Sequence, residues 1–112
     1  MFERYQESLR GLPLKWQEEK EGIRSSRWLT TVRLNDNVAD LESKVTEMVE
    51  NERFEIRRVW KPMHQQSLFE GCQANLNDSA DLLYQTAICL PSGEMSDENF
   101  LAVTGWLQSV LI

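Results

Sequence analysis

The sequence predicts one small domain of α/β (α+β) class, in which helices pack on a small sheet. At 112 residues the chain has room for a single compact core. Residues 28–34 have the composition of a strand, residues 38–51 have helical periodicity, and residues 54–60 again have the composition of a strand. Strand, helix and strand in this order have the length of a βαβ crossover, so we expect the two strands to share one sheet.

Composition and charge exclude two classes of partner. The formal net charge is -6, and no basic stripe is present that could follow a nucleic-acid backbone. Apolar runs are only a few residues long, and residues 1–10 carry charges where a signal peptide would be apolar. We therefore expect a cytoplasmic protein that contacts neither nucleic acid nor membrane.

Two cysteines, Cys72 and Cys89, stand apart without a CxxC pattern or a neighbouring histidine. This spacing indicates neither a zinc site nor a disulfide framework. The expectation is two reduced structural thiols and no metal.

The chain begins with a predicted amphipathic helix whose apolar stripe needs a partner. Gly11 and Pro13 provide its stop signal, and the charged segment 17–26 is predicted to be a loop. The stripe consists of Phe2, Tyr5, Leu9 and Leu12.

The segment 28–34 is the clearest strand, with Trp28, Thr30, Val32 and Leu34 on one side at period two. Residues 35–37, Asn-Asp-Asn, offer capping side chains for the helix that follows. The apolar positions of that helix are Val38, Leu41, Val45, Met48 and Val49.

The remaining elements are a second strand at 54–60, a loop and two helices. Pro62 limits ladder pairing, so residues 61–66 should leave the sheet. Asp78 is expected to cap a helix that runs to about Gln85. The apolar run 87–90 is ended by Pro-Ser-Gly, and Ser96 should cap a final helix. Its stripe is Phe100, Val103, Leu107 and Val110, with Trp106 beside it.

Four segments resemble the DegT family of PLP-dependent sugar aminotransferases. Residues 55–66, EIRRVWKPMHQQ, are similar to the family's I-E-x-R-P-x-W-K-P-M-H-x-Q-P, of which W-K-P-M-H is the specific part. Residues 87–93 resemble its C-L-P-S-G turn, residues 26–30 its S-x-W-L strand, and residues 5–12 the helix leading into the domain. Arg58 and Ser67 replace prolines of the family pattern, which implies a less rigid loop.

The resemblance covers the whole chain and implies that residues 1–112 are the small C-terminal domain of a fold-type I aminotransferase. In that family the large domain supplies the Schiff-base lysine, the acidic partner of the pyridinium and the phosphate cradle. Lys15, Lys20 and Lys44 have the contexts of solvated charges, and Lys61 differs from them only through its motif. This chain is therefore expected to hold no cofactor and to have no catalytic residue of its own.

The resemblance also implies that the loop around W-K-P-M-H faces the nucleotide sugar. The candidate substrate-binding residues are His64, Lys61, Met63, Trp60 and Arg57. His64 either contacts the sugar nucleotide or has a structural role. Lys61 either pairs with a phosphate or is solvated. Trp60 and Met63 either edge the substrate pocket or pack in the core. Arg57 and Arg58 alternate in direction, so at most one of them faces a given site.

Two functions remain open at this point. The chain is either the C-terminal part of a nucleotide-sugar aminotransferase whose large PLP-binding domain is missing, or a noncatalytic module. In the second case, the face left by the lost domain mediates self-association or binds another protein.

Overall fold

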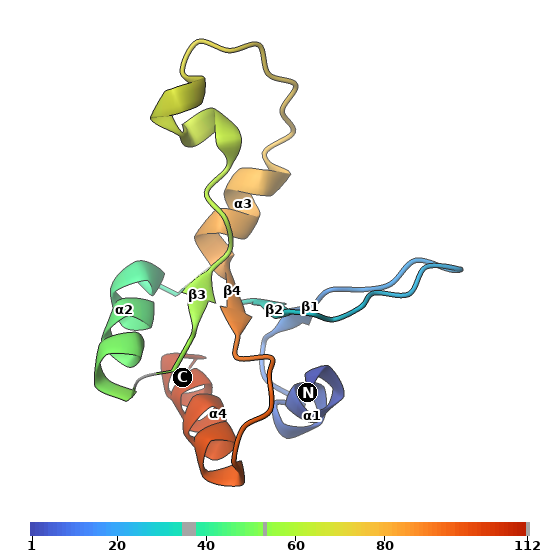
Figure 1. Ribbon diagram of the computed structural model, residues 1–112, viewed down its shortest axis with the longest axis vertical. Helices are drawn as coiled ribbons and strands as arrows, with labels where there is room; N and C mark the ends of the chain where they lie inside the picture. The colour runs from blue at the N-terminus through green and yellow to red at the C-terminus, as the bar shows by residue number, and fades with distance from the viewer. Residues whose placement is uncertain (35–37, 53, 112) are drawn as a thin grey trace.

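The computed structural model describes residues 1–34, 38–52 and 54–111 and contains a four-stranded antiparallel sheet with helices packed on it (Figure 1). The expected mixed class is confirmed. The strands are β1 (Lys15–Trp16), β2 (Thr30–Arg33), β3 (Arg57–Arg58) and β4 (Ala87–Leu90). The helices are α1 (Phe2–Ser8), α2 (Leu41–Glu52), α3 (Ser79–Thr86) and α4 (Asp97–Leu111), with two short 3-10 helices, η1 (Met63–Gln65) and η2 (Ser67–Phe69).

The central strand is β4, in the order β1-β2-β4-β3. It pairs antiparallel with β2 on one edge, where Val32 faces Ile88, and with β3 on the other, where Arg58 faces Ile88. β2 and β3 therefore run parallel with β4 between them. The predicted strand-helix-strand unit is present as β2, α2 and β3, and its two strands belong to one sheet. They are not neighbours, because β4, whose four residues are all buried, lies between them.

One face of the sheet carries the core, and α1, α2 and α4 lie together against it (Figure 1). Alternate strand residues point into this core. The buried cluster is Tyr5, Leu9, Val32, Leu34, Leu41, Val45, Met48, Ile56, Ile88, Leu90, Phe100, Val103 and Leu107. The predicted stripes of the helices that begin at Phe2, Leu41 and Asp97 thus supply most of the core.

Trp28 does not share the inward side of β2, and that part of the strand prediction is wrong. Thr30, Val32 and Leu34 are buried as expected, whereas Trp28 is 72% exposed. The cause is local: Arg27 has a positive φ of 50°, so the backbone before Thr30 is not extended and the period-two alternation does not reach Trp28.

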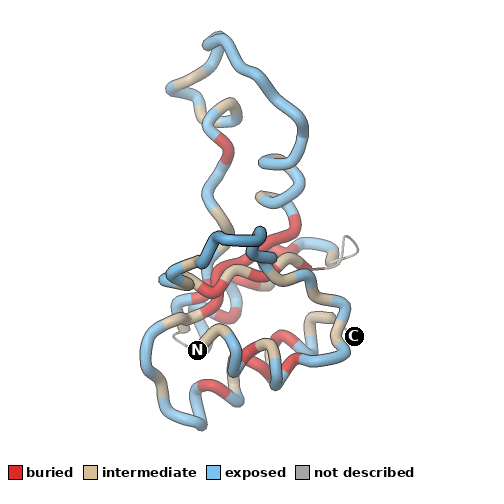
Figure 2. Tube along the Cα trace, turned by 90° about the vertical axis from the view of Figure 1, so that its right-hand side faces the viewer, coloured by how far each residue is buried: buried red, intermediate tan, exposed pale blue. Residues whose placement is uncertain are grey.

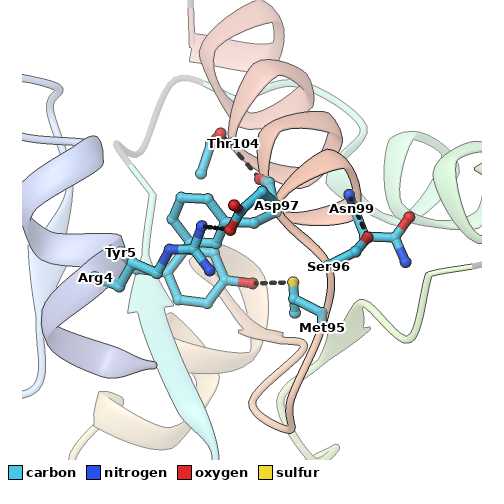
Figure 3. Close-up of polar contacts among 8 residues, drawn as sticks. Arg4, Tyr5, Met95, Ser96, Asp97, Asn99 and Thr104 are labelled. Carbon is cyan, nitrogen blue, oxygen red and sulfur yellow. Dashed lines mark hydrogen bonds and ion pairs between the residues drawn. The ribbon is translucent and has the colours of Figure 1, made fainter.

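Tyr5 and Arg4 of α1 contact the start of α4 (Figure 3). The Tyr5 ring packs 5.0 Å from the ring of Phe100, and the Tyr5 hydroxyl donates a hydrogen bond to the Pro91 carbonyl at 3.0 Å. The hydroxyl also lies 3.9 Å from the Met95 sulfur, a contact that Figure 3 draws. Arg4 stacks 3.9 Å from the centre of the Phe100 ring and forms an ion pair of 2.6 Å with Asp97. These contacts fix α1 to the start of α4.

The predicted helix caps have different outcomes. The Ser96 hydroxyl accepts a hydrogen bond from the Asn99 backbone N–H at 3.2 Å, which confirms the cap of α4. Asp78 precedes α3 but adopts a left-handed conformation with φ 62° and makes no side-chain cap. Asn77 accepts from the Ser79 N–H at 3.3 Å instead. The proposed caps at residues 35–37 lie outside the described residues.

The second predicted strand is much shorter than residues 54–60. Only Arg57–Arg58 pair in the ladder, and Val59 adds one hydrogen bond to the Ala87 carbonyl. β1 was not predicted, because two residues show no alternation; it pairs with Val32 and Arg33 of β2.

Two segments project from the body: the loop of residues 17–29 and an arm of residues 60–86 that ends in α3 (Figure 1). The arm is largely exposed (Figure 2). The radius of gyration, 15.2 Å, exceeds the roughly 13 Å of a compact domain of this length. Within the described ranges, no helix combines the length and apolar character needed to cross a membrane.

We expect Tyr5→Phe to lower the free energy of unfolding by about 1 kcal/mol, because the bond to the Pro91 carbonyl is lost. Burial raises the pKa of Tyr5 from 10.0 to about 12, an effect that Arg4 partly offsets. The unfolded chain therefore ionises first, so this contribution is fully present below pH 10.0 and is lost as the pH rises towards about 12. Urea unfolding of both proteins between neutral and alkaline pH measures this, and an unchanged alkaline slope in Tyr5→Phe would contradict it.

Candidate functional site

The loop that carries W-K-P-M-H leaves β3 and folds into η1 at the start of the arm, as predicted. Pro62 begins the turn, and the Gln65 and Gln66 N–H groups donate to the carbonyls of Pro62 and Met63, both at 3.0 Å. The Gln66 side-chain amide donates to the Lys61 carbonyl at 2.8 Å. Three local hydrogen bonds therefore define the loop although Ser67 replaces the family's proline.

His64 lies against Asp81 on α3, the returning limb of the arm. Its Nε2 is 2.8 Å from Asp81 Oδ1, and the side chains are only 22% and 25% exposed. The Gln65 amide donates to the same carboxylate oxygen. The Gln65 hydrogen bond, followed by that of His64, lowers the pKa of Asp81. Sequence reasoning missed Asp81, because no local pattern indicates that residues 64 and 81 meet.

Arg58 forms the second link across the arm, at its base. Its guanidinium pairs with Glu42 of α2 at 3.1 Å, donates to the Tyr84 carbonyl and stacks 4.0 Å from the centre of the Tyr84 ring. Arg57 points elsewhere: its side chain is 73% exposed and pairs with Glu55 at 3.1 Å. The expected alternation of the two arginines is present. Arg58, which replaces a proline of the family pattern, is the arginine that contacts other elements of the fold.

Trp60 and Met63 are surface residues in this chain, so of the two roles expected for them, packing in the core is wrong. They are 68% and 62% exposed, and Lys61 between them is exposed too. The Trp60 ring lies 6.2 Å from the ring of Trp28, tilted by 32°. The two tryptophans of the motif segments thus meet on the surface, an arrangement the sequence did not predict.

A shallow groove of about 1000 Å³ lies beside Trp60. We call it the aromatic groove. Its apolar part includes Trp16, Trp60, Val59 and Leu83, and its charged lining residues are Lys15, Arg33 and Glu18. Its strand residues Thr31 and Arg33 alternate with the core residues of β2 and so lie on the opposite face of the sheet. The groove therefore occupies the face that the helices of the core leave open.

The lysines do not have the surroundings of an imine-forming lysine, which is desolvated or lies beside another cation. Lys15, Lys20 and Lys61 are exposed, and Lys44 is half-buried on α2. The described residues contain no cluster of three or more metal-ligating side chains. Cys72 is exposed on the arm, and Cys89 is buried in β4 with its sulfur 3.7 Å from the Thr31 hydroxyl.

Arg58→Lys should destabilise the fold by about 1–3 kcal/mol, because lysine loses both the stacking on Tyr84 and the geometry that reaches Glu42 and the Tyr84 carbonyl together. Arg57→Lys is the matched control. Its exposed pair should change stability by no more than about 0.5 kcal/mol. Chemical denaturation compares the two, and equal effects would show that Arg58 does not fasten the arm.

Comparison with known proteins gives a consistent result in sequence and in structure. No protein-family model matches the sequence. The chain is 30% identical over 104 residues to the putative pyridoxal phosphate-dependent aminotransferase EpsN of Bacillus subtilis (strain 168), an alignment that spans 88% of this chain and 26% of EpsN.

Two solved structures share its fold. The aminotransferase TlmJ from Streptoalloteichus hindustanus matches with a TM-score of 0.76 at 22% identity. A DegT DnrJ EryC1 StrS aminotransferase from Brucella abortus matches with a TM-score of 0.69 at 17% identity. Each match covers 97% of this chain but only 29% of the other. The chain thus spans little more than a quarter of the length of these relatives, and it is similar in sequence to one segment of a putative pyridoxal phosphate-dependent aminotransferase and in fold to one segment of two aminotransferase structures.

Proposed function

We propose that the chain is the small C-terminal domain of a PLP-dependent sugar aminotransferase, that it completes the nucleotide-sugar side of the substrate site, and that it is not catalytic by itself. One observation carries the proposal: the similarity extends over 88–97% of this chain and over only 26–29% of the relatives. The part without a counterpart here would hold PLP, which supplies the electron sink for amino transfer. We further propose that the complete enzyme is cytoplasmic and acts in the biosynthesis of polysaccharides or related sugars.

The arrangement of the motif loop supports a substrate-facing role. Trp60, Lys61 and Met63 are exposed in a loop that its own hydrogen bonds order, so they can contact a ligand without rearrangement of the backbone. The Lys61 ammonium suits the concentrated charge of a diphosphate. Trp60 offers an apolar ring, and His64 a polar group. Arg57, farther back in β3, has an exposed guanidinium that can pair with a carboxylate or a phosphate.

The apolar surface supports the view that a further body covers part of this chain. Several large apolar side chains are exposed around the aromatic groove and on the arm, which is unusual for a small monomer. They are Trp28, Trp60, Met63, Leu68, Leu76, Leu82 and Leu83. Contact with the PLP-binding domain would remove them from water.

The isolated chain should form no aldimine with PLP. In a titration we expect no aldimine absorbance, and after borohydride reduction no lysine adduct by intact mass, because three of the lysines are exposed and Lys44 is only half-buried on a helix surface. Full-length EpsN serves as the positive control. A stoichiometric adduct on a single lysine would instead make the chain a PLP protein in its own right.

A chimera tests the substrate-facing role, with this chain in place of the matching segment of EpsN. Lys61→Ala should weaken nucleotide-sugar binding about tenfold, the effect of losing one charge-assisted hydrogen bond. Lys20→Ala, in the exposed loop of residues 17–29, should leave binding unchanged. Equal Kd values for the two variants by calorimetry would contradict the assignment.

The second candidate function is a noncatalytic module that self-associates through the same surface. The exposed contact of Trp28 with Trp60 favours it. If this reading holds, sedimentation velocity should detect dimers or larger species of the chain, and Trp60→Lys should dissociate them. Leu101→Lys is the control, because Leu101 is 65% exposed on α4, away from the groove lining. A monodisperse monomer would exclude this function.

A further inference from the structure

We propose that Asp81 is a positioning residue that holds the neutral His64 ring in its Nε2–H tautomer, so that Nδ1 is the hydrogen-bond acceptor offered to a ligand. The proposal concerns the chain's own geometry. It rests on the proposed function only for the identity of the ligand that meets Nδ1.

The contact between His64 and Asp81 is short and sheltered. The distance from Nε2 to Oδ1 is 2.8 Å, and each side chain has about three quarters of its surface removed from water. It links η1 on the outgoing limb of the arm with α3 on the returning limb. The link from Arg58 to Tyr84 lies nearer the body, so the two limbs are fixed at two levels.

The chemistry of the partner determines the tautomer. A neutral imidazole has one N–H donor and one acceptor nitrogen, whereas an ionised carboxylate only accepts hydrogen bonds. The amide of Gln65 donates to the same Asp81 oxygen, and convergence of two donors on one oxygen is typical of a carboxylate in its charged form. An aspartate carboxyl is ionised at neutral pH, and the hydrogen bond from Gln65, with that from His64, lowers the pKa of Asp81 further against the opposing effect of burial. Nε2 must therefore carry the proton.

This assignment restricts what His64 can recognise. An acceptor nitrogen binds a hydroxyl or an ammonium group, and it does not bind a phosphate, which offers only acceptors when fully ionised. Within the loop, His64 would therefore bind a donor group of the sugar, while the Lys61 ammonium, three residues earlier in the sequence, would bind the diphosphate. The ring remains 22% exposed, which leaves part of it accessible to such a group.

The tautomer can be measured directly, because His64 is the only histidine in the chain. In long-range ¹H–¹⁵N correlation spectra above the pH of ring protonation, the unmodified chain should show the Nε2–H pattern. The expected bias over the other tautomer is at least about tenfold, in line with a hydrogen bond to a charged group. Asp81→Asn should reduce this bias about tenfold, since an amide can either accept from or donate to Nε2.

Asp78→Asn is the matched control, an exposed carboxylate at the start of the same helix whose left-handed backbone asparagine tolerates. It should leave the His64 spectrum unchanged. A backbone amide spectrum verifies that each variant is folded, and Asp81→Ala replaces Asp81→Asn if the latter is not.

Two results would overturn the proposal: an Nδ1–H or evenly mixed pattern in the unmodified chain, or an unchanged pattern in a folded Asp81 variant. The measurement needs neither PLP nor a nucleotide sugar. Failure of the proposed function in the chimera would leave its outcome untouched, and the reverse also holds.

Discussion

The pairing of β4 on both of its edges is the constraint on which the rest of the structure depends. Its four residues are buried, so its backbone polar groups need partners, and most of these partners lie in β2 and β3 or directly beside them. This requirement draws together segments that lie far apart in the chain. The turn after β4 binds two further segments. The Ser92 hydroxyl accepts a hydrogen bond from the Thr30 N–H at 2.6 Å, and the Pro91 carbonyl accepts one from the Tyr5 hydroxyl. α1, β2 and α4 are thus located relative to one short strand.

The arm is a consequence of that arrangement. β3 and β4 are antiparallel neighbours in the sheet, and α3 leads directly into β4. The residues between β3 and β4 must therefore leave the body and return to it. An unsupported excursion of this length would have considerable conformational freedom. Two polar links across the limbs, Arg58 with Tyr84 and His64 with Asp81, restrict it. The motif loop is therefore held in place although most of the arm has no apolar core beneath it.

The sequence predicted what depends on local chemistry and missed what depends on distant contacts. Helical stripes and the Ser96 cap are set by spacing and by one hydroxyl, and they were found. Trp28 was misplaced because the positive φ of Arg27 ends the alternation, a conformation that no pattern in the sequence announces. The motif identified the loop of His64, but its partner Asp81 comes from another limb. Recognition of a site segment is thus easier than prediction of its surroundings.

The two tryptophans, Trp28 and Trp60, lie in segments whose backbones are ordered by polar contacts, but their rings are not covered by the core. Trp28 and Trp60 are 72% and 68% exposed, yet their rings lie 6.2 Å apart beside a groove on the open face of the sheet. Large apolar rings in that position lose the favourable free energy of burial, roughly 1.5–3 kcal/mol for a large side chain. That free energy becomes available when a second body covers the rings. Because the arm that carries Trp60 is already ordered by its two links, association would require little further loss of conformational entropy. The aromatic pair therefore gives a proposed partner domain an apolar contact that costs little further ordering of this chain.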